Sequence, residues 1–148
     1  MITSPLVITP DNRPRALDVF GTAVTVLGFA SQMGEYGVTY QEGPEGSGPP
    51  PHSHDWDEAF FVLSGEVRFL CGEQTQVCPA GTLVHIPKHT THGFAYCAGG
   101  GSMLEFTSRE SKSAEMFTDI DAEIDSEHPD IQKALEVLAR YGLKVSPP

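Results

Sequence analysis

The stretch GSGPPPHSHDWDE, residues 46–58, places two histidines and a glutamate close together in the chain. His52 and His54 are two residues apart, so on an extended strand both imidazoles point to the same face. Glu58 has the same parity and joins them on that face if no bulge intervenes. Because imidazole and carboxylate suit first-row divalent metals, the stretch predicts a metal site that a second strand completes.

A later stretch, GTLVHIPKHTTH at residues 81–92, supplies a further histidine. A short apolar segment ends at Pro87, and the turn that follows presents His92. His52, His54, Glu58 and His92 together predict one divalent transition metal, for which Fe, Ni, Mn, Co, Zn or Cu are all suitable. A lone His-x-His pair is often only two exposed polar residues, so the metal prediction depends on both stretches.

The two stretches resemble the two sequence motifs of the cupins. Residues 46–65 match the first motif at every position, and residues 81–92 match the glycine, proline and histidine of the second. His89 and Tyr96 replace a glycine and an asparagine of the second motif, outside the ligand set. The resemblance implies an all-β, single-domain cupin jelly-roll β-barrel (double-stranded β-helix) of the small, quercetin dioxygenase-like and RmlC-like kind, with a short C-terminal helical segment.

Composition and charge restrict the possible partners. A chain of 148 residues suits one domain, and 15 Gly with 12 Pro suit frequent turns between short strands. The net charge of -11 argues against nucleic acid and membrane surfaces as partners. There is no apolar run of about 20 residues and no signal-peptide pattern, and the 3 Cys suit reduced thiols, so we expect a cytoplasmic protein.

Three segments are predicted along the chain. Residues 1–15 form an arm, residues 16–110 the cupin barrel, and residues 111–148 a helical tail that packs on the barrel. The resemblance implies that the arm pairs with a second subunit, giving a homodimer. Within the tail, a short helix is expected at 113–124 and a clearer one at 129–141. The second should bury one apolar stripe: Ile131, Ala134, Leu135, Leu138 and Tyr141.

Glycines divide the predicted strands. Ser64 and Gly65 predict a tight hairpin between segments 59–63 and 66–70, and the glycines at 99–101 predict a break between segments 93–97 and 102–107. Strand alternation would send part of the neighbouring large side chains into a pocket above the metal, and the sequence leaves open which ones. The candidates for this substrate pocket are Tyr40, Phe60, Phe69, His85, Phe94, Tyr96, Met103 and Phe106.

The resemblance also implies an activity. In quercetin dioxygenases the corresponding glutamate is both a metal ligand and the base that acts on an enolic substrate. We therefore expect a metal-dependent dioxygenase, an oxidoreductase, with Glu58 as the catalytic residue and an apolar aromatic or enolic small molecule as substrate. Two alternatives stay open: a non-oxidative cyclase, isomerase or lyase, for example of the polyketide cyclase kind, and a cupin that binds a small molecule without catalysis.

Overall fold

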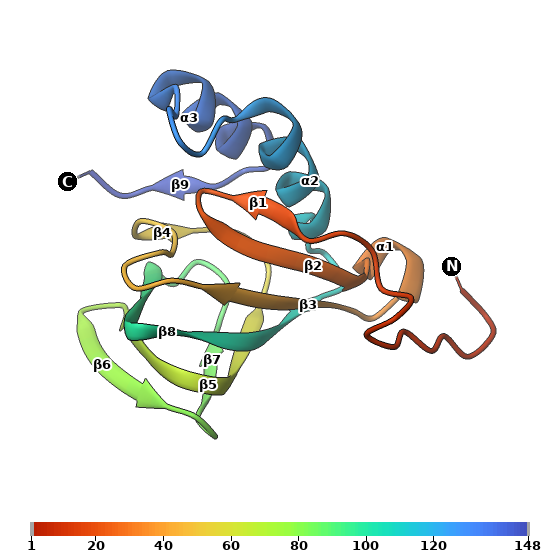
Figure 1. The fold of residues 1–148 in the computed structure, drawn as a ribbon. Coiled ribbons are helices and arrows are strands. Elements are labelled where there is room, and N and C mark those ends of the chain that lie inside the picture. Colours follow the sequence, from red (N-terminus) through yellow and green to blue (C-terminus); the bar gives the residue numbers. More distant parts are fainter. Residues whose placement is uncertain (1, 148) are drawn as a thin grey trace.

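Two long paired strands organise the protein. The structure is a computed structural model that describes residues 2–147. Its elements are β1 (Leu17–Val19), β2 (Thr22–Gly28), α1 (Ala30–Met33), β3 (Tyr36–Gly43), β4 (His52–Ser53), β5 (Glu58–Cys71), β6 (Gln74–Pro79), β7 (Leu83–Ile86), β8 (His92–Ser108), α2 (Ser113–Glu123), α3 (Ile131–Arg140) and β9 (Lys144–Val145). The strands form a single curled, nine-stranded sheet, which confirms the predicted cupin jelly-roll class (Figure 1).

β5 and β8 run antiparallel along nearly their whole length, and each half of either strand has a different outer neighbour. Residues 58–61 of β5 pair with β7, whereas residues 66–71 pair with β6. Residues 101–108 of β8 pair with β3, whereas His92 pairs with β4. This exchange of neighbours turns the sheet back on itself, so that inward-facing side chains of both halves meet inside the barrel.

The predicted hairpin at Ser64 and Gly65 is wrong, because β5 continues through both residues. The strand bends there instead: Phe60 and Val62 face inward before Gly65, and Val67 and Phe69 face inward after it. A Cβ on Gly65 would lie 2.1 Å from the Gly100 carbonyl oxygen, so only glycine permits this contact. β8 likewise continues through the glycines at 99–101, where a break was predicted, because both strands bend at the same place.

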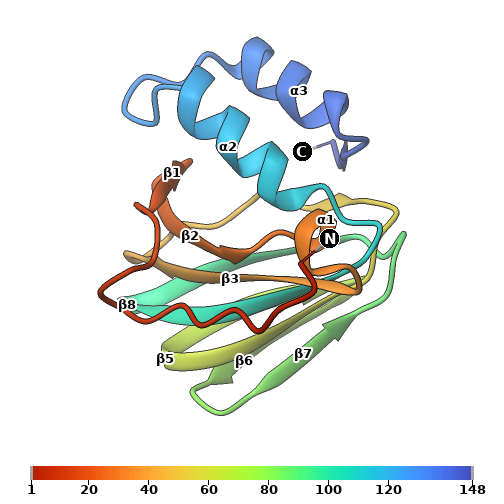
Figure 2. The ribbon, with the colours of Figure 1, turned by 90° about the vertical axis from the view of Figure 1, so that its right-hand side faces the viewer.

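Two apolar clusters fill the molecule. The first, here called the barrel core, lies between the strands and contains Phe60, Val62, Val67, Phe69, Cys78, Ile86, Phe94, Tyr96 and Met103. The second, here called the roof cluster, joins β2 to both C-terminal helices and contains Val24, Met116, Phe117, Ile120, Ile124, Ala134, Val137 and Leu138. The helices and β9 thus cover one end of the barrel, beside β1 and β4 (Figures 1 and 2).

Both tail helices occur where the sequence predicts them. α3 begins at Ile131, because the Asp130 side chain caps it by accepting a hydrogen bond from Lys133 N (3.1 Å). Its predicted stripe is only partly right: Val137 is buried, whereas Ile131 and Leu135 are 65% and 47% exposed. α3 packs against α2 and β9 on one flank only, so its buried face is narrower than the apolar pattern.

The N-terminal arm crosses the outside of the barrel. Its described part, residues 2–15, contains no strand, and Ile2 N donates a hydrogen bond to Gln32 O (2.6 Å). The Arg13 guanidinium lies 5.0 Å from the centre of the Tyr40 ring, a cation–π contact that holds the arm against β3. Among the described residues, every helix is too short or too polar to cross a lipid bilayer.

Candidate metal centre and its cavity

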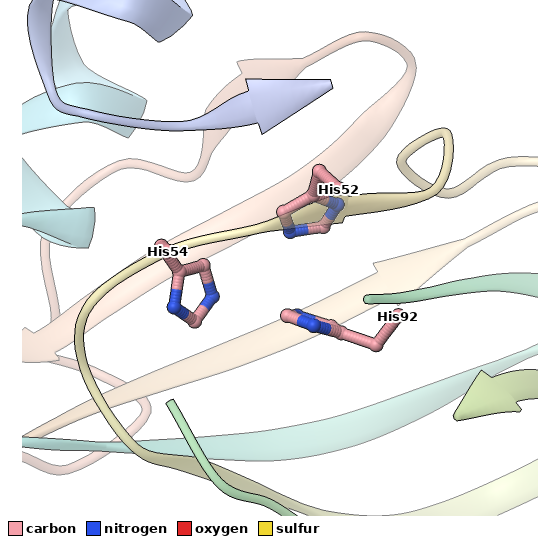
Figure 3. Close-up of side chains that lie close together, drawn as sticks. All are labelled: His52, His54 and His92. Atoms are coloured by element: carbon pink, nitrogen blue, oxygen red, sulfur yellow. The ribbon is translucent and has the colours of Figure 1, made fainter. Parts of the chain in front are cut away.

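Three imidazoles converge at the covered end of the barrel. β4 lies between β8 and β9, and His52 stands opposite His92 in the register, with ring centres 4.3 Å apart. His54 follows β4, and its ring centre lies 4.9 Å from that of His92. One ring nitrogen from each histidine lies within 4.8 Å of the other two, and all three side chains are buried (Figure 3).

Backbone carbonyls fix the orientation of each ring. The Nδ1 atoms of His52, His54 and His92 lie 2.8, 3.0 and 2.8 Å from the carbonyl oxygens of Pro50, Trp56 and Thr90. A carbonyl oxygen only accepts hydrogen bonds, so each Nδ1 carries the proton and donates. In the neutral rings every Nε2 therefore keeps a free lone pair, which is the arrangement that metal-ligating histidines adopt.

Glu58 completes the group from the start of β5. Its Oε2 lies 2.9 Å from His54 Nε2, and its Oε1 lies 3.2 Å from His92 Nε2. Burial alone would raise the pKa of Glu58, but hydrogen bonds and positive charge from His54 and His92 outweigh it and lower the pKa to about 2. The carboxyl group is therefore ionised at neutral pH.

His92 and His52 have pKa shifts in opposite directions. Burial opposes the charged form of His92, but the hydrogen bond and charge of Glu58 prevail and raise its pKa. Burial lowers the pKa of His52 to about 4, assisted by the charge of His92. At neutral pH His52 is thus a neutral imidazole, the form that binds metals.

The donor set fits a divalent transition metal. A lone pair on Nε2 cannot face a carboxylate oxygen at about 3 Å unless a cation, a proton or a metal ion, lies between them. Among the described residues, the buried His92 Nε2 has no polar partner other than Glu58 Oε1 at 3.2 Å. Separations of about 3 Å are also those of adjacent ligand atoms around an ion bound at about 2.0–2.2 Å. The three buried histidines could therefore bind a metal ion, with Glu58 as a proposed fourth ligand.

Trp56 supports the centre from outside. Its indole stacks on the His54 ring with centres 4.1 Å apart and planes 9° apart. Residues 52, 54, 56 and 58 are all buried, so the alternation expected from the sequence continues through the loop between β4 and β5. Trp56 therefore braces His54, and it also borders a cavity.

A cavity of about 70 Å³ separates the four candidate ligands from the roof cluster. Its apolar wall comes from both layers: Phe60 and Phe94 of the barrel strands, and Met116, Phe117, Ile120 and Leu138 of the helices. Ligand pockets for drug-sized molecules are usually about 300–1,000 Å³. A cavity of this volume consequently suits a small molecule.

The predicted pocket residues are distributed more widely. Phe60 and Phe94 line the cavity, whereas Phe69, Tyr96 and Met103 point into the barrel core on its far side. The remaining three face outward: the Tyr40 hydroxyl donates a hydrogen bond to Glu42 Oε2 (3.2 Å), His85 is exposed, and Phe106 is 37% exposed. The inward parity of β8 changes at the glycine bend, which sends Glu105 inward and Phe106 outward.

Two features of the cavity were not predicted from the sequence. Glu105 on β8 is 3% exposed and lines the cavity, where its Oε1 accepts a hydrogen bond from Thr39 Oγ1 (3.0 Å). The helical roof was predicted as a packing element, but its place over the candidate ligands was not. An acid among apolar neighbours in a strand would have been the available signal for Glu105.

Comparisons with known proteins agree with this fold. Residues 39–107 match the family model described as Cupin domain. None of the curated proteins matches the chain significantly.

Three solved structures resemble this one. An RmlC-like cupin from Shewanella frigidimarina is 20% identical with a TM-score of 0.67, covering 75% of this chain and 96% of its own. KdgF from Halomonas sp. is 13% identical with a TM-score of 0.67, and the match covers 75% of this chain and 99% of KdgF. The polyketide cyclase RemF from Streptomyces resistomycificus is 18% identical with a TM-score of 0.61, and the match covers 72% of this chain and 80% of RemF. At these identities the likeness shows the fold alone.

The family match and the fold together support the cupin superfamily. The chain has a cupin jelly roll with three clustered histidines that could bind a metal ion. The identity of the metal and the quercetin dioxygenase-like subtype stay predictions.

Proposed function

We propose that this protein is a metal-dependent enzyme that acts on an enolic or aromatic small molecule, and that it is a dioxygenase. The carrying observation is the buried, ionised Glu58 between two imidazoles at the edge of an apolar cavity. His52, His54, Glu58 and His92 would hold the metal. A bound transition metal supplies Lewis-acid polarisation of a carbonyl or enolate oxygen, and a redox-active one supplies electron transfer for oxygen chemistry.

The chain's own residues account for the proton transfer. Glu58 stays ionised at neutral pH, so it is an acceptor for the proton of a substrate hydroxyl or of an activated carbon. The apolar walls from Phe60, Phe94 and the roof exclude water, which strengthens each electrostatic interaction inside. The loss of a proton gives the substrate the electron-rich form with which oxygen reacts.

Oxygen uptake tests the proposal. The protein is loaded in turn with each candidate metal and offered β-diketones, which the small cavity favours, then dihydroxyaromatics and flavonols. We expect uptake with one class and its loss, by about 10²–10⁴-fold, in Glu58→Gln. Glu66→Gln, an exposed glutamate on the same strand, is the matched control and should retain activity. No uptake with any metal and any class would overturn the dioxygenase proposal.

A non-oxidative cyclase, isomerase or lyase is the second candidate. The likeness to the polyketide cyclase RemF favours it, because the same fold supports that activity. Turnover of the same compounds under strict anaerobiosis, with product formed at the aerobic rate, would select this candidate over the dioxygenase.

A further inference from the structure

A second buried carboxyl group faces the cavity from the strand beside Glu58. Glu58 stands opposite Thr107 in the β5–β8 register, and Glu105 stands opposite Phe60, so the two acids are diagonal neighbours on the inner face. Diagonal partners across antiparallel strands are about 7–8 Å apart at the backbone. Both side chains line the same cavity, so a small molecule there can meet both acids.

Among the described residues, no lysine or arginine reaches the interior to balance an ionised Glu105. All nine Lys and Arg side chains are exposed. The groups that face Glu105 from β3 are the Thr39 hydroxyl and the Gln41 amide, and the charged group on β5 is Glu58, an anion. An isolated buried carboxylate is strongly unfavourable, so the neutral acid is the stable form.

The ionisation preferences agree with this geometry. Burial raises the pKa of Glu105 well above its usual range, and the charge of Glu58 raises it further. Hydrogen bonds from Thr39 and Gln41 lower the same pKa by less.

The cavity contains further unused polar atoms. Among the described residues, Thr22 Oγ1 and Trp56 Nε1 are buried without a hydrogen-bond partner, and both residues line the cavity. A buried donor without an acceptor is costly, and an indole N–H can only donate. These atoms indicate a ligand that carries oxygen.

We propose that Glu105 is the proton donor of the site, acting opposite Glu58 on an uncharged dicarbonyl compound. Glu58 takes the proton from the carbon between the two carbonyl groups, and the freed electron pair forms a carbon–carbon double bond. The carbonyl π electrons move to oxygen, which takes the proton of Glu105. The bound product is the enol, an isomer of the substrate, and return of the proton from Glu58 to Glu105 restores both acids. This inference depends on the proposed function for its substrate class.

Infrared spectroscopy tests the protonation state without turnover. We expect the wild-type protein at neutral pH to show the C=O stretch of a protonated carboxyl group, lost in Glu105→Gln and kept in Glu66→Gln. In Thr39→Val the band should shift, since the carboxyl loses the Thr39 hydrogen bond. A band unchanged in Glu105→Gln, or no band in wild type, would overturn the proposal even if the protein is a dioxygenase.

Binding of acetylacetone as a probe tests the donor role. Glu105→Gln keeps a hydrogen-bond donor and should bind the probe within about threefold of wild type, whereas Glu105→Met should bind about tenfold more weakly. Thermal melting and metal content verify that each variant is folded. If Glu105→Met does not fold, the enolisation rate of Glu105→Gln is the test of the proposal. This rate is measured as the exchange of the central hydrogens of acetylacetone for deuterium in heavy water. That rate should fall at least tenfold, and an unchanged rate would contradict the proposal.

Discussion

The barrel core and the roof cluster are both apolar, but they differ in what surrounds them. The barrel core is enclosed by strands, and Val62, Val67 and Met103 are 0% exposed. The roof cluster has strands on one side only, and its helices form one wall of the cavity. The contrast indicates that the first cluster holds the fold, whereas the second closes the site.

Matched phenylalanine truncations should separate these two roles most clearly. Phe69→Ala in the barrel core removes a 2% exposed ring from an enclosed environment and should lower the free energy of unfolding by about 3–5 kcal/mol. Denaturant titration of the metal-free protein gives the value. A smaller loss than in Phe117→Ala of the roof cluster would contradict the conclusion that the barrel core holds the fold.

His52 lies at the cavity between the barrel core and the roof cluster, and its burial can be tested by the pH dependence of stability. Its pKa is about 4 in the folded protein, below the usual 6.5, so between pH 6.5 and 4 only the unfolded chain takes up this proton. The metal-free wild type should therefore lose about 3 kcal/mol more than His52→Asn as the pH falls through this window. If the free energy of unfolding falls equally with pH in both proteins, His52 is not shielded from solvent in the folded state.

Phe117→Ala truncates the roof. Phe117 is 8% exposed and borders the cavity, so neighbouring side chains can partly collapse, and we expect a loss of about 2–3 kcal/mol. Removal of bound metal by a chelator should become faster in this variant and not in Phe69→Ala. Equal metal-release rates in both variants would mean that the roof does not control access.

The smallest effect should come from the outer face of α3. Leu135→Ala, at a side chain that is 47% exposed, should change stability by less than about 0.5 kcal/mol. Leu138→Ala, at a neighbouring position that is 8% exposed, should cost about 2 kcal/mol. A large loss in Leu135→Ala, or a change in molecular mass by light scattering, would point instead to the predicted homodimer using this face.

The sequence predicted the fold and the positions of the clustered imidazoles well, because both depend on local spacing. His52, His54 and Glu58 share one parity, and the turn after Pro87 delivers His92 opposite His52. The bends at Gly65 and at residues 99–101 were not predictable as bends, since a glycine looks the same in a turn and in a bulge. Each bend reverses the inward parity, which is why Phe106 faces outward and Glu105 was missed.

The strand that carries His52 has partners that come much later in the chain. His52 pairs with His92 and with Val145, and Ser146 N donates a hydrogen bond to Pro51 O (2.9 Å). During synthesis, the barrel strands can pair before residues 144–146 leave the ribosome, but β4 then lacks its outer neighbour. Metal capture should therefore be among the last events of maturation, after the helices have folded over the barrel.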